Sequence, residues 1–381
     1  MRPIYLDHLA TTPCDPRVVK RLLPFLSEDF GNAGSRTHAY GWAADEACKQ
    51  AREQVAALIH ATPREIIFTS GATEANNLAL KGVAEAGLPK GRHIITQVTE
   101  HHAVLAPVEV LEKHGFSVTR LPVDAFGRVD PAAVEAALRP DTVLVSIMHA
   151  NNEVGTLQPI AEIAALCRAR GVLVHTDAAQ SVGKIPLDVG ALGVDLLSMS
   201  AHKLYGPKGI GALYVRHGHP RVPLAAQQHG GGQERGLRAG TLPVHQVVGF
   251  GAAAELCGQE MGAEIERLRA LRDALQAALS ALPGVRINGH PTERLPGALH
   301  VSFDGVEGAL LPALRGLAVS SGSACMSDPP EPSHVLRALG RSPQQAHASL
   351  RFGLGRGTTA SDIEAAAQQV EAAVRSLRRP S

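Results

Sequence analysis

Short apolar segments alternate with longer segments of helical pattern over the first two thirds of the chain. The apolar segments predict strands at Glu65–Thr69, His93–Val98, Val143–Met148, Val172–Thr176, Asp195–Met199 and Gly211–Val215. The segments between them predict helices at Glu74–Ala86, Ala103–His114, Pro131–Leu138 and Ile160–Arg170. Continuously apolar strands separated by helices are typical of a mostly parallel sheet that is covered on both faces. In such sheets, ligands bind at the carboxyl ends of the strands.

The pattern is different toward both ends of the chain. Near the start, Asp15-Pro16 predicts the beginning of a helix, and a loop at residues 31–41 precedes a helix from Ala43 to about His60. After Gly240, a long alanine-rich helical region extends from about Pro243 to Leu282. The elements predicted after it are strands at Ala298–Phe303, Leu317–Ser320 and Ser349–Gly353, and a last helix after the capping box Thr359–Asp362. We therefore expect a second, smaller lobe.

Composition narrows the class of protein. The 381 residues are 45% hydrophobic and 19% charged with a net charge of +1, so no overall charge favours binding to nucleic acid or a membrane surface. The five cysteines are scattered and form no Cys-x-x-Cys pair, which argues against a disulfide framework and a cysteine-rich zinc site. The start, MRPIYLDHLA, has no apolar signal core, and no apolar stretch approaches membrane-spanning length. We expect a protein of the reducing cytoplasm.

A lysine lies in the turn between two of the apolar runs. Residues 196–215 read LLSMSAHKLYGPKGIGALYV, which places Ser200, His202 and Lys203 directly after a predicted strand. Desolvation at such a position lowers the pKa of a lysine, and a neutral amine can form an imine with a carbonyl cofactor such as pyridoxal phosphate (PLP). The alternative is a surface lysine in a hairpin.

Polar residues also follow the other predicted strands. Thr73 lies where a helix begins, which suits a phosphate, although it could also be an ordinary helix cap. His101 could stack on a flat ring or move a proton, or be only a loop histidine. Asn152 belongs to a polar run that suggests a pocket or a simple turn. Asp177 ends a buried strand, where it could pair with a protonated pyridine nitrogen or cap a helix.

Three later segments complete the set of candidates. The stretch GGGQERGLRAGT, residues 230–241, fits neither a P-loop nor a dinucleotide fingerprint and is interpreted as a mobile loop whose last hydroxyl, on Thr241, could reach a phosphate. Small residues surround Cys325 and indicate an accessible, reactive thiol. Arg351 lies on a predicted strand and could bind a carboxylate with two hydrogen bonds. Together, these residues indicate PLP chemistry on a sulfur-containing amino acid.

In this order, the motifs resemble those of the cysteine desulfurases of the aminotransferase-like PLP fold. The matching segments are YLDHLATTPCDPRV, FGNAGSRTHAYGW, TSGATEANN, TEHHAV, NNEVGTLQPI, HTDAAQSVGK, SAHKLYGPKGIGALY, GGGQERGLRAGT, SSGSACMS and EPSHVLRALG. The chain most resembles the class with a long catalytic-cysteine loop. The resemblance implies an α/β fold like that of aspartate aminotransferase. A mostly parallel seven-stranded sheet would lie in a large PLP-binding domain at 16–258, and a smaller α+β domain at 1–15 with 259–381 would carry the cysteine loop.

The resemblance also implies roles for individual residues. Lys203 would hold PLP as an internal aldimine, and Asp177 would pair with the pyridine nitrogen. Gln180 would approach the ring hydroxyl, and His101 would stack on the ring and assist proton transfer. The phosphate ligands would be Thr73, Ser200, His202 and, from the other subunit of a homodimer, Thr241.

The implied reaction converts L-cysteine to L-alanine. Asn152 and Arg351 would bind the substrate, with Arg351 on its carboxylate, while Cys325 attacks the substrate sulfur and becomes a persulfide. Acceptor proteins, such as an iron–sulfur scaffold or thiolation enzymes, would receive the sulfur, and Cys325 could transiently contact an iron–sulfur cluster. No metal site, nucleic acid or membrane is expected. The alternatives are a selenocysteine lyase, another PLP-dependent enzyme of this fold, or an inactive member that serves as a binding platform.

Overall fold

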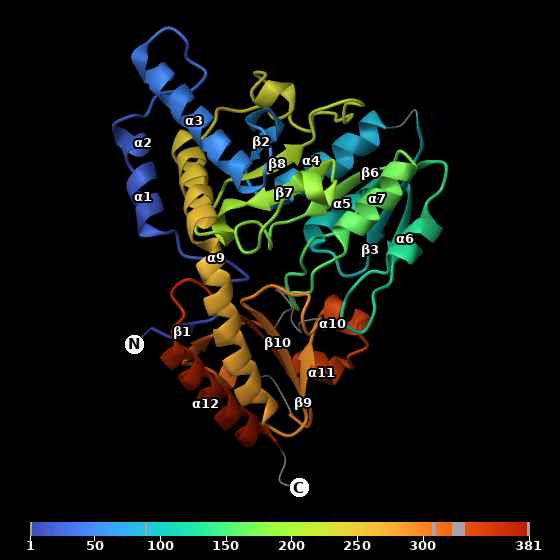
Figure 1. Ribbon diagram of the computed structural model, residues 1–381, viewed down its shortest axis with the longest axis vertical. Helices are drawn as coiled ribbons and strands as arrows, with labels where there is room; N and C mark the ends of the chain where they lie inside the picture. The colour runs from blue at the N-terminus through green and yellow to red at the C-terminus, as the bar shows by residue number, and fades with distance from the viewer. Residues whose placement is uncertain (1, 88–89, 307–309, 322–331, 379–381) are drawn as a thin grey trace.

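The computed structural model describes residues 2–87, 90–306, 310–321 and 332–378 (Figure 1). A seven-stranded sheet with the order β2-β8-β7-β6-β5-β3-β4 occupies the upper half of this view. Its strands are β2 Ile66–Thr69, β3 His93–Gln97, β4 Ser117–Leu121, β5 Thr142–Ser146, β6 Leu173–Asp177, β7 Leu196–Ser200 and β8 Gly211–Val215. Only β8 is antiparallel to its neighbours among these seven strands. The predicted fold class is confirmed.

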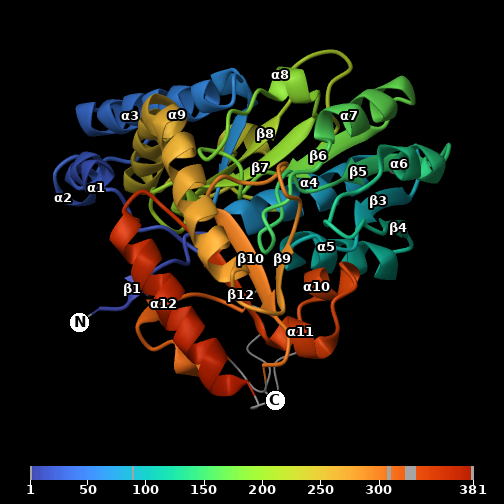
Figure 2. The same ribbon diagram turned by 60° about the horizontal axis from the view of Figure 1, so that its bottom comes forward.

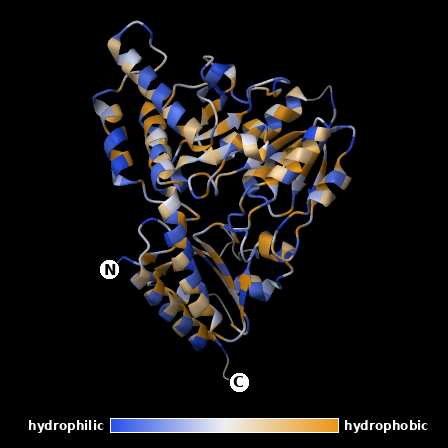
Figure 3. Ribbon diagram, in the orientation of Figure 1, coloured by the Kyte–Doolittle hydropathy of each residue, from blue (hydrophilic) through white to orange (hydrophobic). Residues whose placement is uncertain are grey.

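Both faces of this sheet are buried, because successive side chains of each central strand enter different cores. In β3, for example, Ile94 packs with α4 and α5, whereas Ile95 packs in the core that contains α3, α7 and the first part of α9. Figure 3 shows the resulting hydrophobic colour along the strands. The helices are α1 Pro16–Leu22, α2 Pro24–Ser27, α3 Ala39–Leu58, α4 Ala72–Ala86, α5 His102–Lys113, α6 Pro131–Ala137, α7 Ile160–Ala169, α8 Val189–Leu192, α9 Val244–Ser280, α10 His334–Ala338, α11 Pro343–His347 and α12 Ala360–Leu377.

A second core lies in the lower half of the molecule. An antiparallel sheet of order β12-β10-β9 packs there against α12 and the last turns of α9, and Figure 2 shows this arrangement from below. A two-stranded parallel sheet joins the N-terminal segment to this half. The strands are β1 Ile4–Tyr5, β9 Val285–Asn288, β10 Ala298–Phe303, β11 Leu317–Ala318 and β12 Ser349–Gly353. Helix α9 is continuous through both cores, because it contributes Phe250 to the upper one and Leu275 to the lower one.

Several element boundaries differ from the sequence prediction. Helix α3 begins at Ala39, four residues before the predicted start, because the His38 ring accepts a hydrogen bond from the amide of Gly41 and caps the helix. Strand β4 was not predicted. It lies at the edge of the sheet, and its SVTRL sequence alternates in polarity and is only partly buried. Strand β9, which is also an edge strand with an alternating pattern, was not predicted either. No helix in the described part of the chain is long and apolar enough to cross a membrane.

Candidate active site

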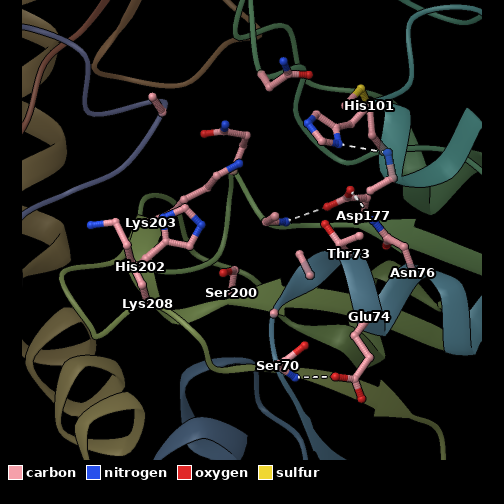
Figure 4. A pocket seen from close by; sticks show the side chains of 18 of the residues that line it. Ser70, Thr73, Glu74, Asn76, His101, Asp177, Ser200, His202, Lys203 and Lys208 are labelled. Atoms are coloured by element: carbon pink, nitrogen blue, oxygen red, sulfur yellow. Dashed lines mark hydrogen bonds between the residues drawn. The ribbon is translucent and has the colours of Figure 1, made fainter. Parts of the chain in front are cut away.

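A cavity of about 420 Å³ opens at the carboxyl ends of β3, β5, β6 and β7 and at the start of α4 (Figure 4). Its volume is within the range of small-molecule sites in proteins. Of the residues proposed from the sequence, those that line it are Thr73, His101, Asn152, Asp177, Gln180, Ser200, His202 and Lys203. The convergence follows from the topology, since parallel strands end at the same edge of the sheet.

Lys203 extends into this cavity from the short 3-10 turn Ala201–Lys203 that follows β7. No side chain in the described part of the chain forms an ion pair or a hydrogen bond with the Lys203 amine. Burial lowers the pKa of Lys203, the charge of Arg351 lowers it further, and Asp177 opposes both effects. The result favours a nucleophilic amine. Lys203 does lie in the connection between the antiparallel strands β7 and β8, as the hairpin alternative has it, but its side chain lines the cavity.

Asp177 is the last residue of β6 and faces the same space as Lys203 and His101 (Figure 4). One of its carboxylate oxygens accepts a hydrogen bond from the Ala179 amide at 3.0 Å, and the other accepts from Asn76 Nδ2 at 2.7 Å. These two donors fix the carboxylate at the cavity wall and stabilise its negative charge.

Asn76 was not predicted from the sequence. It lies in the second turn of α4, is fully buried, and its Oδ1 has no hydrogen-bond partner among the described residues. The available signal was the asparagine pair Asn76-Asn77 just before the apolar run of α4. Because Asn77 instead bonds back to the Thr73 carbonyl, the pattern alone could not tell which of the two enters the site.

The lower part of the cavity is suited to a phosphate. Helix α4 begins at Ala72 with Gly71 as its N-cap, and no side chain caps it, so its first amide groups have no partner within the helix. Thr73 is therefore not the cap, and its hydroxyl joins those amides and Ser200 in the lining. His202 is held by the hydroxyl of Thr11 at 3.0 Å. Burial and the nearby lysines lower the pKa of His202 to about 4, so it is a neutral donor or acceptor.

His101 caps helix α5. Its Nδ1 accepts a hydrogen bond from the Ala103 amide at 3.0 Å, so the proton of the neutral ring is on Nε2. Burial lowers the pKa of His101, and the charge of Lys203 adds to this effect. The ring is thus neutral at physiological pH, and Nε2 carries the one proton that it can donate.

Arg351 lies on β12 and does not line the cavity. Its guanidinium is instead held beside the cavity, with Nη2 2.8 Å from Asp7 Oδ1 and Nη1 3.1 Å from the backbone oxygen of Asn152. The side chain is 8% exposed, and its Nε has no hydrogen-bond partner in the described part of the chain. The Oδ1 atom of Asn152 is also buried without a partner there. The two residues that carry these unsatisfied groups are in contact through the Nη1 hydrogen bond to the Asn152 backbone.

Three other predictions have different outcomes. Thr241 is exposed and, within this one chain, does not line the cavity. The segment 230–241 is not a free loop, because Glu234 is buried and forms a two-point ion pair with Arg52 and accepts a hydrogen bond from the Phe68 amide. Cys325 lies outside the described residues.

The cavity fits PLP on three observations. It offers an unpaired amine at Lys203, a fixed carboxylate at Asp177 for a protonated ring nitrogen, and neutral donors at a helix start for the phosphate. The family profile described as aminotransferase class V matches residues 4–366. The cysteine desulfurase IscS of Methylococcus capsulatus is 56% identical over 380 residues, which cover 100% of this chain and 94% of that protein. The chain belongs to the cysteine desulfurase family.

Solved structures agree with this assignment. A NifS-like protein matches with a TM-score of 0.91 and 39% identity over 98% of this chain and 100% of its own. The protein SspA, solved in complex with cysteine, matches with a TM-score of 0.82 and 39% identity over 92% of this chain and 98% of its own. Cysteine desulfurases are PLP-dependent enzymes, and PLP is therefore the cofactor of this family member.

Proposed function

We propose that the chain removes sulfur from L-cysteine, with PLP held at Lys203 and Cys325 as the first sulfur acceptor. The observation that carries this proposal is the convergence of the Lys203 amine, the Asp177 carboxylate and the His101 ring on one cavity. PLP supplies an electron sink for the pair released at the substrate α-carbon. The relatives named cysteine desulfurase favour this reaction over the selenocysteine lyase alternative.

The side chains around the cavity have distinct tasks. Arg351 binds the substrate carboxylate through donors that Asp7 and the Asn152 backbone leave free, and the Asn152 amide orients the substrate beside it. Lys203 Nζ, whose pKa is lowered by burial, would accept the proton of the substrate α-carbon. His101 Nε2, which carries the proton of the neutral ring, donates a proton to the substrate side of the cavity and later takes it back.

Sulfur transfer to Cys325 balances without an external oxidant. The Cys325 thiolate attacks the substrate sulfur, so an S–S bond forms while the carbon–sulfur bond of the substrate breaks. The bonding pair stays with the substrate carbon, which is protonated and released as part of alanine. The protein keeps a persulfide, which a thiol of an acceptor protein removes in the same way.

The described residues on either side of Cys325 support this role. Ser320 pairs with Arg351 through two backbone hydrogen bonds, the shorter at 2.6 Å. After the undescribed segment, Ser333 donates a hydrogen bond to Glu153, the neighbour of Asn152. The described residues that flank the segment with Cys325 therefore contact Arg351 on one side and the neighbour of Asn152 on the other.

Further parts of the proposal concern organisation. We place the domain boundary within α9, with residues 16–258 around the upper core and 1–15 with 259–381 around the lower core. A homodimer would bring Thr241 to the partner's phosphate site. Apolar residues that are more than half exposed favour an interface; they are Leu23, Leu26, Phe30, Tyr40 and Trp42.

Four described cysteines are free thiols, as expected in the cytoplasm. The acceptors we propose are proteins of iron–sulfur cluster assembly, such as a scaffold, or of thiolation.

The test is sulfur release from L-cysteine by the purified holoenzyme. We expect alanine and sulfide in equal amounts with a thiol reductant, and one additional sulfur atom on Cys325 by mass spectrometry without it. Cys325→Ser should keep the yellow cofactor and lose sulfide release. Full activity of this variant would refute the persulfide route, and an absence of turnover in the wild type would favour a binding platform.

A further inference from the structure

A second lysine contacts the cofactor site indirectly. Lys184 Nζ lies 3.1 Å from Gln180 Oε1, and Gln180 Nε2 donates to the backbone oxygen of Leu9 at 2.8 Å. These contacts fix which end of the Gln180 amide is oxygen and which is nitrogen. Gln180 is 3% exposed and lines the cavity, so one N–H of its amide is still available to a ligand there.

Lys184 has no role in the reaction proposed for this site, although burial disfavours a charge on its amine. It lines a separate space of about 30 Å³, large enough for one water molecule, together with His8, Leu9 and Tyr205. In the described part of the chain no carboxylate forms an ion pair with it. Burial lowers the pKa of Lys184 to about 7, and repulsion from Lys203 and Arg351 adds to this effect.

We infer that Lys184 is a positioning residue that acts through Gln180 on the ring hydroxyl of the cofactor. The inference rests on the proposed function, because it requires that Gln180 approach that hydroxyl. A cation at Oε1 polarises the amide and makes the free N–H of Gln180 a stronger donor. A stronger donor stabilises the ring oxygen as an anion, and that oxygen then holds the proton at the Lys203 nitrogen less tightly.

The direct field of Lys184 acts in the same direction. A positive charge near Lys203 disfavours a proton on the Lys203 nitrogen. The other ionisable groups around Lys184 are Arg351 on β12, Cys257 and Glu264 on α9, His8 in the N-terminal segment, and His202 and Tyr205 in and after the lysine turn. Glu264 pairs with Arg356, and burial lowers the pKa of His8, so neither neutralises Lys184.

The test is a pH titration of the visible absorbance of the bound cofactor, which reports the proton at the Lys203 nitrogen without turnover. Lys184 acts on this midpoint only while its amine is protonated, and burial lowers the pKa of that amine to about 7. We therefore expect Lys184→Met to raise the midpoint by at most about 1 pH unit. Lys184→Arg, which keeps the cation, should return the midpoint toward the wild-type value. Lys49→Met, which removes an exposed lysine on α3, is the matched control and should leave it unchanged.

A double-mutant cycle separates the route through Gln180 from the direct field. In a Gln180→Ala background, the shift caused by Lys184→Met should fall to less than half. An equal shift in both backgrounds, or no shift in either, would overturn the inference. If Gln180→Ala alone leaves the midpoint unchanged, then the assignment of Gln180 to the ring hydroxyl fails, and the inference falls with it. If the wild type shows no absorbance that depends on Lys203, the proposed function itself is wrong.

Discussion

Arg351→Lys tests whether the guanidinium on β12 is the substrate carboxylate clamp. The arginine has five N–H donors, of which the structure engages one with Asp7 and one with the Asn152 backbone oxygen. A carboxylate can therefore still receive two hydrogen bonds from the remaining donors. A lysine at this position has three donors on one nitrogen, and after the same two contacts it has one left.

The expected loss is that of one hydrogen bond between charged groups. Such a bond contributes about 1.5–3 kcal/mol, which corresponds to a rise in KM for L-cysteine of roughly 10- to 150-fold at 1.4 kcal/mol per tenfold change. The value of kcat should change far less, because Arg351 contacts the carboxylate equally in the ground state and the transition state. Cofactor content should stay normal, since Arg351 does not line the cofactor cavity.

Initial rates of alanine formation over a range of cysteine concentrations give KM and kcat separately. Arg286→Lys is the matched control, because Arg286 forms an exposed ion pair with Asp304 far from the cavity. An unchanged KM in Arg351→Lys would refute the carboxylate clamp. A fall in kcat without a change in KM would instead place Arg351 in the chemical step.

Three further predictions concern buried polar groups and are checked by denaturant unfolding of the PLP-free protein. Burial raises the pKa of Glu100 to about 8, so the folded state holds a proton that the unfolded state releases above about pH 4.5, and stability falls as pH rises between these values. Glu100→Gln should remove up to about 1.4 kcal/mol of this loss per pH unit, and an unchanged pH profile would contradict it. Asn76→Ala should destabilise the fold by about 1.5–3 kcal/mol by removing a hydrogen bond to the Asp177 carboxylate; a neutral effect would mean that Asp177 needs no such support. Glu234→Ala should cost about 3–5 kcal/mol, because it leaves the partly buried Arg52 without its ion-pair partner and the Phe68 amide without its acceptor, and a loss below about 1 kcal/mol would restore the mobile-loop interpretation.

The central strands were predictable because their side chains are apolar on both faces, and such strands are stable only where both faces of a sheet are covered. Edge strands β4 and β9 carry mixed sequences, and their pairing depends on neighbours that pattern analysis does not reveal. The same reasoning explains the site. Strand-end residues such as Asp177 and Lys203 were predicted because parallel strands end together.

Residues that act from the interior of other elements were not predictable. Asn76 meets Asp177 across 101 positions, and Asp7 meets Arg351 across 344. Lys184 follows Gln180 by one helical spacing, yet nothing in the sequence indicates that its amine turns inward to the Gln180 amide. Such contacts depend on tertiary packing, which decides the partner of a buried polar group.

Three lysines lie at or beside the cavity: Lys203 and Lys208 line it, and Lys184 contacts Gln180, which lines it. The proposed function requires that Lys203 hold the cofactor. Borohydride reduction of the holoenzyme followed by peptide mapping measures this directly, because the reduced bond attaches the cofactor permanently to one side chain. We expect the added mass on Lys203 in the wild type and no added mass in Lys203→Ala. Attachment to Lys184 or Lys208 in the wild type would show that another lysine holds the cofactor.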